Sequence, residues 1–310
     1  SRESTSASMT DATLAFELYA SAVVATRHCF ARLAEHEPPL AELDHVAGCI
    51  ARMAHDPALT IAVPLAAAAN DDPSRAVQCA FIAARVAQRA GATETATVGA
   101  VLAALLVDSG RARLASGTDI DLNVFSELPD SLDVLAPAAT VALAITGPKS
   151  ELRQWAALSA FEVAWLERPR LGELYQGEIS PRLLSRIIVA CRALLVRVSP
   201  KTRDEALSPF TALRQLCSEP GADHVALGLL ARAIGAIPVG TVVELTSRDQ
   251  GVVGPEPNQD PKRPALRTLG GQALEGPSIV RVVEPEGDHP SAAFALLDPV
   301  HSSSATDPDP

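Results

Sequence analysis

Apolar residues recur with helical spacing along most of the first 235 residues, and this pattern constrains the fold more than any other feature of the chain. Residues typical of helix ends support it. Asn70–Ser74 is a cluster of capping residues, and Gly91 lies where the helix that this cluster opens should end. We therefore expect helices over about 11–34, 41–54, 57–70, 71–90, 93–107, 129–146, 150–167, 180–198, 208–217 and 222–235.

After Ile237–Gly240 the spacing changes to a two-residue alternation, which is typical of strands. We expect strands near 241–245, 251–253, 264–269 and 278–283, with a turn at Ser247–Gln250. The predicted fold is mainly α, a helical bundle with a small C-terminal antiparallel β-unit. We expect the following divisions: a disordered N-terminus over 1–10, a helical extension over 11–70, a helical domain over 71–236, the β-unit over 237–299 and a disordered tail over 300–310.

The composition narrows the class of protein. Hydrophobic residues make up 47% of the chain and aromatic residues only 4%, so the core must be built from Ala, Leu, Val and Ile. The net charge of -11 disfavours nucleic acids and anionic membranes as partners, because like charges repel. The apolar stretches 58–69 and 98–107 are shorter than the ~20 residues of a membrane-spanning helix. Five cysteines without a CxxC pair, and no recognised signal sequence, predict a cytoplasmic protein with reduced, buried thiols.

The most informative motif is Ala103–Arg111, which reads Ala-Ala-Leu-Leu-Val-Asp-Ser-Gly-Arg. It resembles the helix end Ala-Leu-Leu-His-Asp-Ile-Gly-Lys of the HD phosphohydrolase superfamily, in the form used by HD-GYP cyclic-dinucleotide phosphodiesterases. The resemblance implies an HD-domain-like helical bundle, and it covers about residues 40–270. Further segments resemble the same family in the same order along the chain: 55–59, 74–77, 185–190, 206–214 and 238–245.

Active members of this family hold two or three divalent metals, commonly iron or manganese, between His and Asp side chains of several helices. The metals generate hydroxide and neutralise the phosphodiester. The Gly-Tyr-Pro loop of the family is absent here. In the resemblance, the family's first His corresponds to Arg75, its His-Asp pair to Val107 and Asp108, and the Lys that follows the pair to Arg111. A further His corresponds to Ala136, which precedes Pro137, and the paired His correspond to Val163 and Ala164, which follow Glu162. The late Asp corresponds to Arg192.

Histidine is missing from the whole segment that the family uses to bind metal. None of the seven histidines lies between residues 56 and 223. An isopropyl group such as that of Val107 cannot bind a metal, and Asp108 with Glu162 would hold one Mg²⁺ only weakly. The resemblance therefore implies a chain without a metal cofactor and without catalytic residues.

Two interpretations of the arginines Arg75, Arg111 and Arg192 remain open. In the first, a guanidinium takes the place of the metal and pairs with Asp108, so that the carboxylate is not left alone. In the second, the arginines line a vestigial pocket, together with Asp108 and Glu162, that binds a cyclic dinucleotide or another phosphate ligand.

We therefore expect a catalytically inactive, HD-GYP-like protein that acts as a regulatory or scaffolding partner in bacterial cyclic-dinucleotide or two-component-type signalling. Its partner would be another protein, and a homodimer is compatible with the sequence. Two alternatives are kept. One is a phosphate or nucleotide sensor that uses the arginine pocket, and the other is a residual metal-dependent cyclic di-GMP phosphodiesterase.

Overall fold

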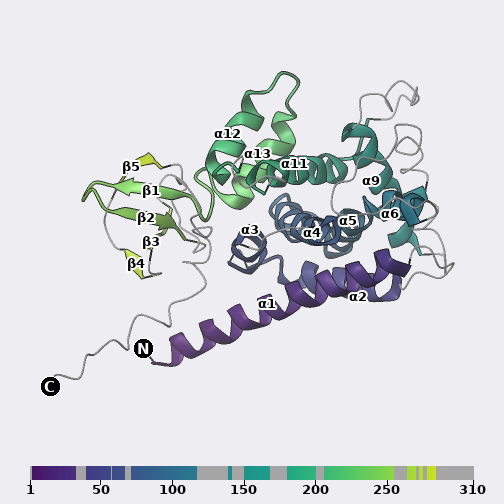
Figure 1. Ribbon diagram of the computed structural model, residues 1–310, viewed down its shortest axis with the longest axis horizontal. Coiled ribbons are helices and arrows are strands. Elements are labelled where there is room, and N and C mark those ends of the chain that lie inside the picture. The colour runs from purple at the N-terminus through teal and green to yellow at the C-terminus, as the bar shows by residue number, and fades with distance from the viewer. Residues whose placement is uncertain are drawn as a thin grey trace.

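The computed structural model describes residues 2–32, 40–56, 58–66, 71–116, 139–141, 150–167, 180–199, 206–254, 264–269, 272–274 and 278–283. They form a helical bundle with a small antiparallel sheet at one end (Figure 1), which confirms the coarse fold prediction. The helices are α1 (Arg2–Ala31), α2 (Leu40–Met53), α3 (Val63–Ala66), α4 (Asp72–Arg89), α5 (Glu94–Leu106), α6 (Ser109–Ser116), α9 (Glu151–Glu167), α11 (Leu183–Val198), α12 (Pro209–Ser218) and α13 (His224–Ile234).

Helix α4 lies at the centre of the bundle, where α1, α2, α5, α11 and α13 pack around it (Figure 1). Every residue from Ser74 to Ala87 is buried. The sequence explains both ends of this helix. Asp71 caps the start by accepting a hydrogen bond from the Ser74 backbone N–H at 2.8 Å. Gly91 follows the end with a φ of 79°, a conformation that glycine adopts without a steric penalty.

Helix α5 packs against α4, α9 and α2, and its residues from Gly99 to Leu106 are buried. In the described part of the chain, one stretch, Glu94–Leu114, has the length and apolar composition of a membrane span. Within its most apolar window, 78% of the residues are buried inside the bundle, so packing against other helices accounts for its composition. Helix α5 ends before a turn at Val107–Asp108, and a new helix, α6, follows directly. The sequence analysis did not predict α6.

Two helical predictions near the N-terminus were wrong in extent. Helix α1 begins at Arg2, whereas we predicted disorder over residues 1–10. No Gly or Pro precedes Pro38, and a helix that is already nucleated adds further residues at little cost. In place of a single helix over 57–70, a π-helical turn (Ala58–Ala62) leads into the short α3. Pro64, which has no N–H to donate, lies at this irregular point.

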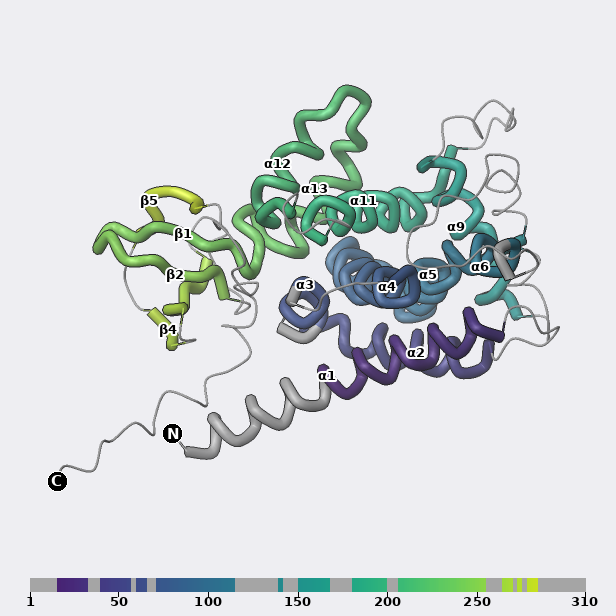
Figure 2. Tube along the Cα trace, viewed as in Figure 1, coloured from purple at the N-terminus to yellow at the C-terminus, as the bar shows by residue number. Residues whose placement is uncertain are grey.

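Helices α1 and α2 pack together along one side of the bundle (Figure 2). Of the predicted helix over 129–146, the structure describes only residues 139–141, which are helical. The predicted tail over 300–310 lies outside the described residues. The remaining predicted helices, at 150–167, 180–198, 208–217 and 222–235, are confirmed as α9, α11, α12 and α13.

The predicted β-unit is a five-stranded antiparallel sheet with the order β4-β3-β2-β1-β5. Two cores hold it. Four side chains on its strands form a small core of their own, whereas Val239 and Val252 belong to the main core of the bundle, so the sheet packs against the helices. The strands are β1 (Val242–Leu245), β2 (Gln250–Val253), β3 (Leu266–Thr268), β4 (Ala273–Leu274) and β5 (Ile279–Val282).

Candidate functional site

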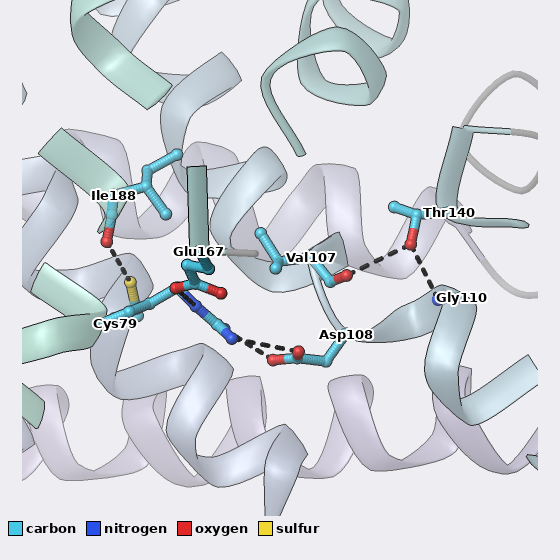
Figure 3. Close-up of polar contacts among 8 residues, drawn as sticks. Cys79, Val107, Asp108, Gly110, Thr140, Glu167 and Ile188 are labelled. Atoms are coloured by element: carbon cyan, nitrogen blue, oxygen red, sulfur yellow. Dashed lines mark hydrogen bonds and ion pairs between the residues drawn. The ribbon is translucent and has the colours of Figure 1, made fainter. Parts of the chain in front are cut away.

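Asp108 lies in the break between α5 and α6, and its carboxylate faces a guanidinium from α11 (Figure 3). Arg192 Nη1 donates to Asp108 Oδ2 at 2.7 Å, and Nη2 donates to Oδ1 at 3.2 Å. The two side chains are only 13% and 6% exposed. The pair is therefore bidentate and buried, which is the geometry that a planar guanidinium forms with a carboxylate.

Glu167, the last residue of α9, binds the remaining edge of the same guanidinium. Arg192 Nε donates to Glu167 Oε1 at 2.6 Å. Burial by itself lowers the pKa of Arg192, but the charges of Asp108 and Glu167 and their hydrogen bonds raise it, and the net pKa lies well above the usual value. One permanent cation thus joins α11 to α9 and to the end of α5.

Further charges surround this contact. Asp72, at the start of α4, is half-buried and lies close enough to Asp108, Arg111, Arg192 and Arg75 for their charges to affect it. Burial raises the pKa of the Asp72 carboxyl, and repulsion from Asp108 raises it further, while the three arginines oppose both effects. The start of α4 therefore adds a second acidic residue beside Asp108.

Arg75, one turn into α4, is buried and donates from Nη2 to the backbone carbonyl of Ser199 at 2.8 Å, at the end of α11. Burial and the neighbouring positive charge of Arg192 lower the pKa of Arg75. We call these six ionisable residues the Arg192 network: Asp72, Arg75, Asp108, Arg111, Glu167 and Arg192.

At the centre of the Arg192 network one guanidinium is paired with two carboxylates, because Arg192 donates hydrogen bonds to both Asp108 and Glu167. Buried charges in proteins are held in this way, by partners that supply both charge and hydrogen bonds. This arrangement favours the first interpretation of the sequence, in which a guanidinium takes the place of a metal beside Asp108.

Glu162 does not join the other four residues that we expected at the site. It lies on α9, where its carboxylate accepts hydrogen bonds from the Arg182 backbone N–H at 3.1 Å, from Arg182 Nε at 3.0 Å and from Ser185 Oγ at 2.5 Å. Arg182 also stacks over the ring of Trp155, 4.9 Å from its centroid. Glu162 thus caps the start of α11, and its assignment to the pocket finds no support in these contacts.

The apolar residues at the family's ligand positions pack in the core. Val107, Val163 and Ala164 are each at most 5% exposed. The backbone carbonyl of Val107 accepts a hydrogen bond from Thr140 Oγ1 at 3.2 Å, and that hydroxyl accepts one from the Gly110 N–H at 3.0 Å (Figure 3). The position Ala136 lies outside the described residues.

The donor set does not fit the divalent metals of the family. Among the described residues, no group of three or more His, Cys, Asp or Glu side chains converges on one point in a way that suits a metal ion. Both oxygens of Asp108 and one oxygen of Glu167 accept hydrogen bonds from Arg192. A cation at this point would compete with a guanidinium that carries its charge permanently.

Sequence reasoning missed Asp72 and Glu167 as members of the network. A usable signal existed for both. A guanidinium expected beside a single carboxylate in a core has five donors to satisfy, which calls for further acceptors nearby. Glu167 ends a predicted helix and Asp72 begins another, so both lie where helix ends converge.

No protein-family model, no curated protein and no solved structure matches this chain. The resemblance to the HD superfamily therefore rests on the sequence motifs alone.

Proposed function

We propose that this chain is a catalytically inactive protein on an HD-domain-like bundle, and that it acts as a regulatory or scaffolding partner in bacterial cyclic-dinucleotide or two-component-type signalling. The observation that carries the inactivity is the contact of Arg192 with both Asp108 and Glu167. The signalling context comes from the motifs that resemble HD-GYP proteins.

The chemistry of a guanidinium argues against hydrolysis at this point. Metal-dependent phosphodiesterases need a cation with an open coordination position, which turns bound water into hydroxide near neutral pH. Arg192 offers no such position, and it cannot act as a general base because it stays protonated. Val107, Val163 and Ala164 supply no ligand that would recruit a metal instead.

The pairing of Arg192 with Asp108 and Glu167 also argues against the sensor alternative. A phosphate ligand binds strongly to arginines that lack carboxylate partners. Here a phosphate would have to displace Asp108 or Glu167 from Arg192, which would leave a buried carboxylate (Asp108) or a half-buried one (Glu167) without its partner. A self-contained network fits a structural centre of a scaffold better than it fits a ligand pocket.

Catalysis and ligand binding are tested on the full purified chain. We expect no hydrolysis of cyclic di-GMP with added Mn²⁺ or Fe²⁺ by chromatography, and no binding heat by calorimetry. Hydrolysis that Asp108→Ala abolishes would establish the phosphodiesterase alternative. Stoichiometric binding that Arg111→Gln weakens would establish the sensor.

The scaffolding role is tested with the tagged full chain in the bacterium that encodes it. We expect a cyclic-dinucleotide enzyme or a response regulator to be enriched over a control bait of similar size and charge. An enrichment that contains no protein of either class contradicts the signalling context.

A further inference from the structure

Three reactive or basic side chains gather on the outer face of α2, away from the Arg192 network. Arg52 Nη2 donates a hydrogen bond to Cys49 Sγ at 3.2 Å, and His45 Nε2 lies 3.7 Å from the same sulfur on the other side. The three residues are separated by four and three positions along α2, so one helix face presents all of them.

The two basic groups are directed at the sulfur and not at acids. Among the residues that the structure describes, neither His45 nor Arg52 forms an ion pair. The Arg52 guanidinium also lies against the helix surface, because its Nη1 is 3.5 Å from the point where a Gly48 side chain would begin. Cys49 itself is half-buried, and the contacts of its sulfur with His45 and Arg52 lie at the exposed surface of the helix.

The other cysteines provide a comparison within the same chain. Cys29, Cys79 and Cys191 are buried, and burial raises the pKa of each thiol, to about 12 for the first two. Cys217 is exposed, yet in the described part of the chain its sulfur forms no hydrogen bond with Arg214, the basic residue three positions before it. Our prediction that the thiols are buried thus fails for Cys49 and Cys217, and these two differ in their surroundings.

We propose that Cys49 is the reactive thiol of this chain and a site of reversible oxidation by hydrogen peroxide or an organic hydroperoxide. The nucleophile is the sulfur of Cys49, to which the Arg52 guanidinium donates a hydrogen bond and beside which His45 Nε2 lies. The sulfur attacks one peroxide oxygen, the O–O bond breaks as the S–O bond forms, and the departing hydroxide or alkoxide takes a proton from water. Sulfur loses two electrons to the peroxide and becomes a sulfenic acid, which a thiol can later reduce.

The test measures each cysteine separately in the intact folded protein. The protein is treated with limiting iodoacetamide, or with peroxide followed by dimedone, and each cysteine peptide is quantified by mass spectrometry. We expect Cys49 to react at least about fivefold faster than Cys217, although Cys217 is more exposed, because Arg52 donates a hydrogen bond to the Cys49 sulfur that can hold negative charge as the sulfur attacks. Equal rates at the two cysteines would overturn the proposal.

Two variants separate the role of the neighbours from simple exposure. Arg52→Gln and His45→Gln should each slow Cys49 several-fold and leave Cys217 unchanged, whereas Arg52→Lys should keep more of the rate than Arg52→Gln. Both native side chains are exposed, so the variants are expected to fold. In concentrated urea the preference for Cys49 should vanish. A Cys49 rate that is unaffected by Arg52→Gln, or a preference that persists in urea, contradicts the proposal.

Discussion

Replacing Arg192 by Met removes the cation that joins three helices while keeping a side chain of similar length. Asp108 and Glu167, which are 6% and 24% exposed, would both lose their partner. Breaking a buried ion pair by removing one member costs about 3–5 kcal/mol, because an uncompensated charge stays buried. Since two carboxylates are affected, we expect the upper part of this range, about 4–5 kcal/mol of the free energy of unfolding.

Urea unfolding followed by circular dichroism measures this loss. The matched control is Arg281→Met, which breaks an equally short ion pair with Glu244 at 2.6 Å, but with an arginine that is 72% exposed. An exposed pair contributes about 1 kcal/mol or less. The deficit of Arg192→Met should shrink as the pH falls, because protonation removes the unpaired charge of the buried carboxylates. A loss no larger than that of Arg281→Met would refute the claim that the Arg192 network holds the bundle together.

Three further predictions concern other parts of the chain. Hydrogen bonding and the charge of Arg186 lower the pKa of Asp223, so Asp223→Asn should cost about 1 kcal/mol near pH 7. Urea titrations should show the difference from the wild type vanishing as the pH falls through the lowered pKa of Asp223, below the usual range of an aspartate. Gly235→Ala should lower the melting temperature, because φ is 97° there and the new Cβ would lie 3.0 Å from a carbonyl oxygen, whereas Gly228→Ala, in open space on α13, should raise it. Val107→His should bind no Mn²⁺ in equilibrium dialysis and should cost about 2 kcal/mol, because it places an imidazole in the core.

Each of these has an outcome that would contradict it. A deficit of Asp223→Asn that persists at pH 2 would mean that the ionised carboxylate is not what stabilises the start of α13. Equal melting temperatures for the two glycine variants would mean that the backbone at Gly235 is not strained by a side chain. Tight Mn²⁺ binding by Val107→His would mean that a single ligand is enough to rebuild the site.

The sequence predicted those elements whose signals are local. Asp71 precedes the start of α4 and Gly91 follows its end, as expected. The change from helical spacing to a two-residue alternation after Gly240 marks the start of the sheet. Strand β4 has only two residues, which is too short for an alternation of polar and apolar side chains to be detected. The turn between α5 and α6 at Val107–Asp108 involves tertiary contacts, such as the hydrogen bond between Thr140 and Gly110, that a local sequence pattern does not reveal.

The candidate site was predictable only in part, for a physical reason. The motif spacing brought Asp108 and Arg192 together, and the structure places them in contact. Glu162 was misplaced because neighbouring positions on a helix point in different directions, so a residue next to two core positions can face the start of another helix. Only the packing of α9 against α11 decides which carboxylate meets Arg192, and that residue is Glu167.

The most direct test of the central claim, that Arg192 stands where a metal would otherwise bind, is the metal content of the purified full chain. The protein is produced in cells grown with ample iron and manganese, and the metals are counted by plasma mass spectrometry. We expect less than about a tenth of an iron or manganese ion per chain, because no group of His, Cys, Asp or Glu side chains among the described residues could retain one. About one or more ions per chain would contradict this expectation and would support the phosphodiesterase alternative.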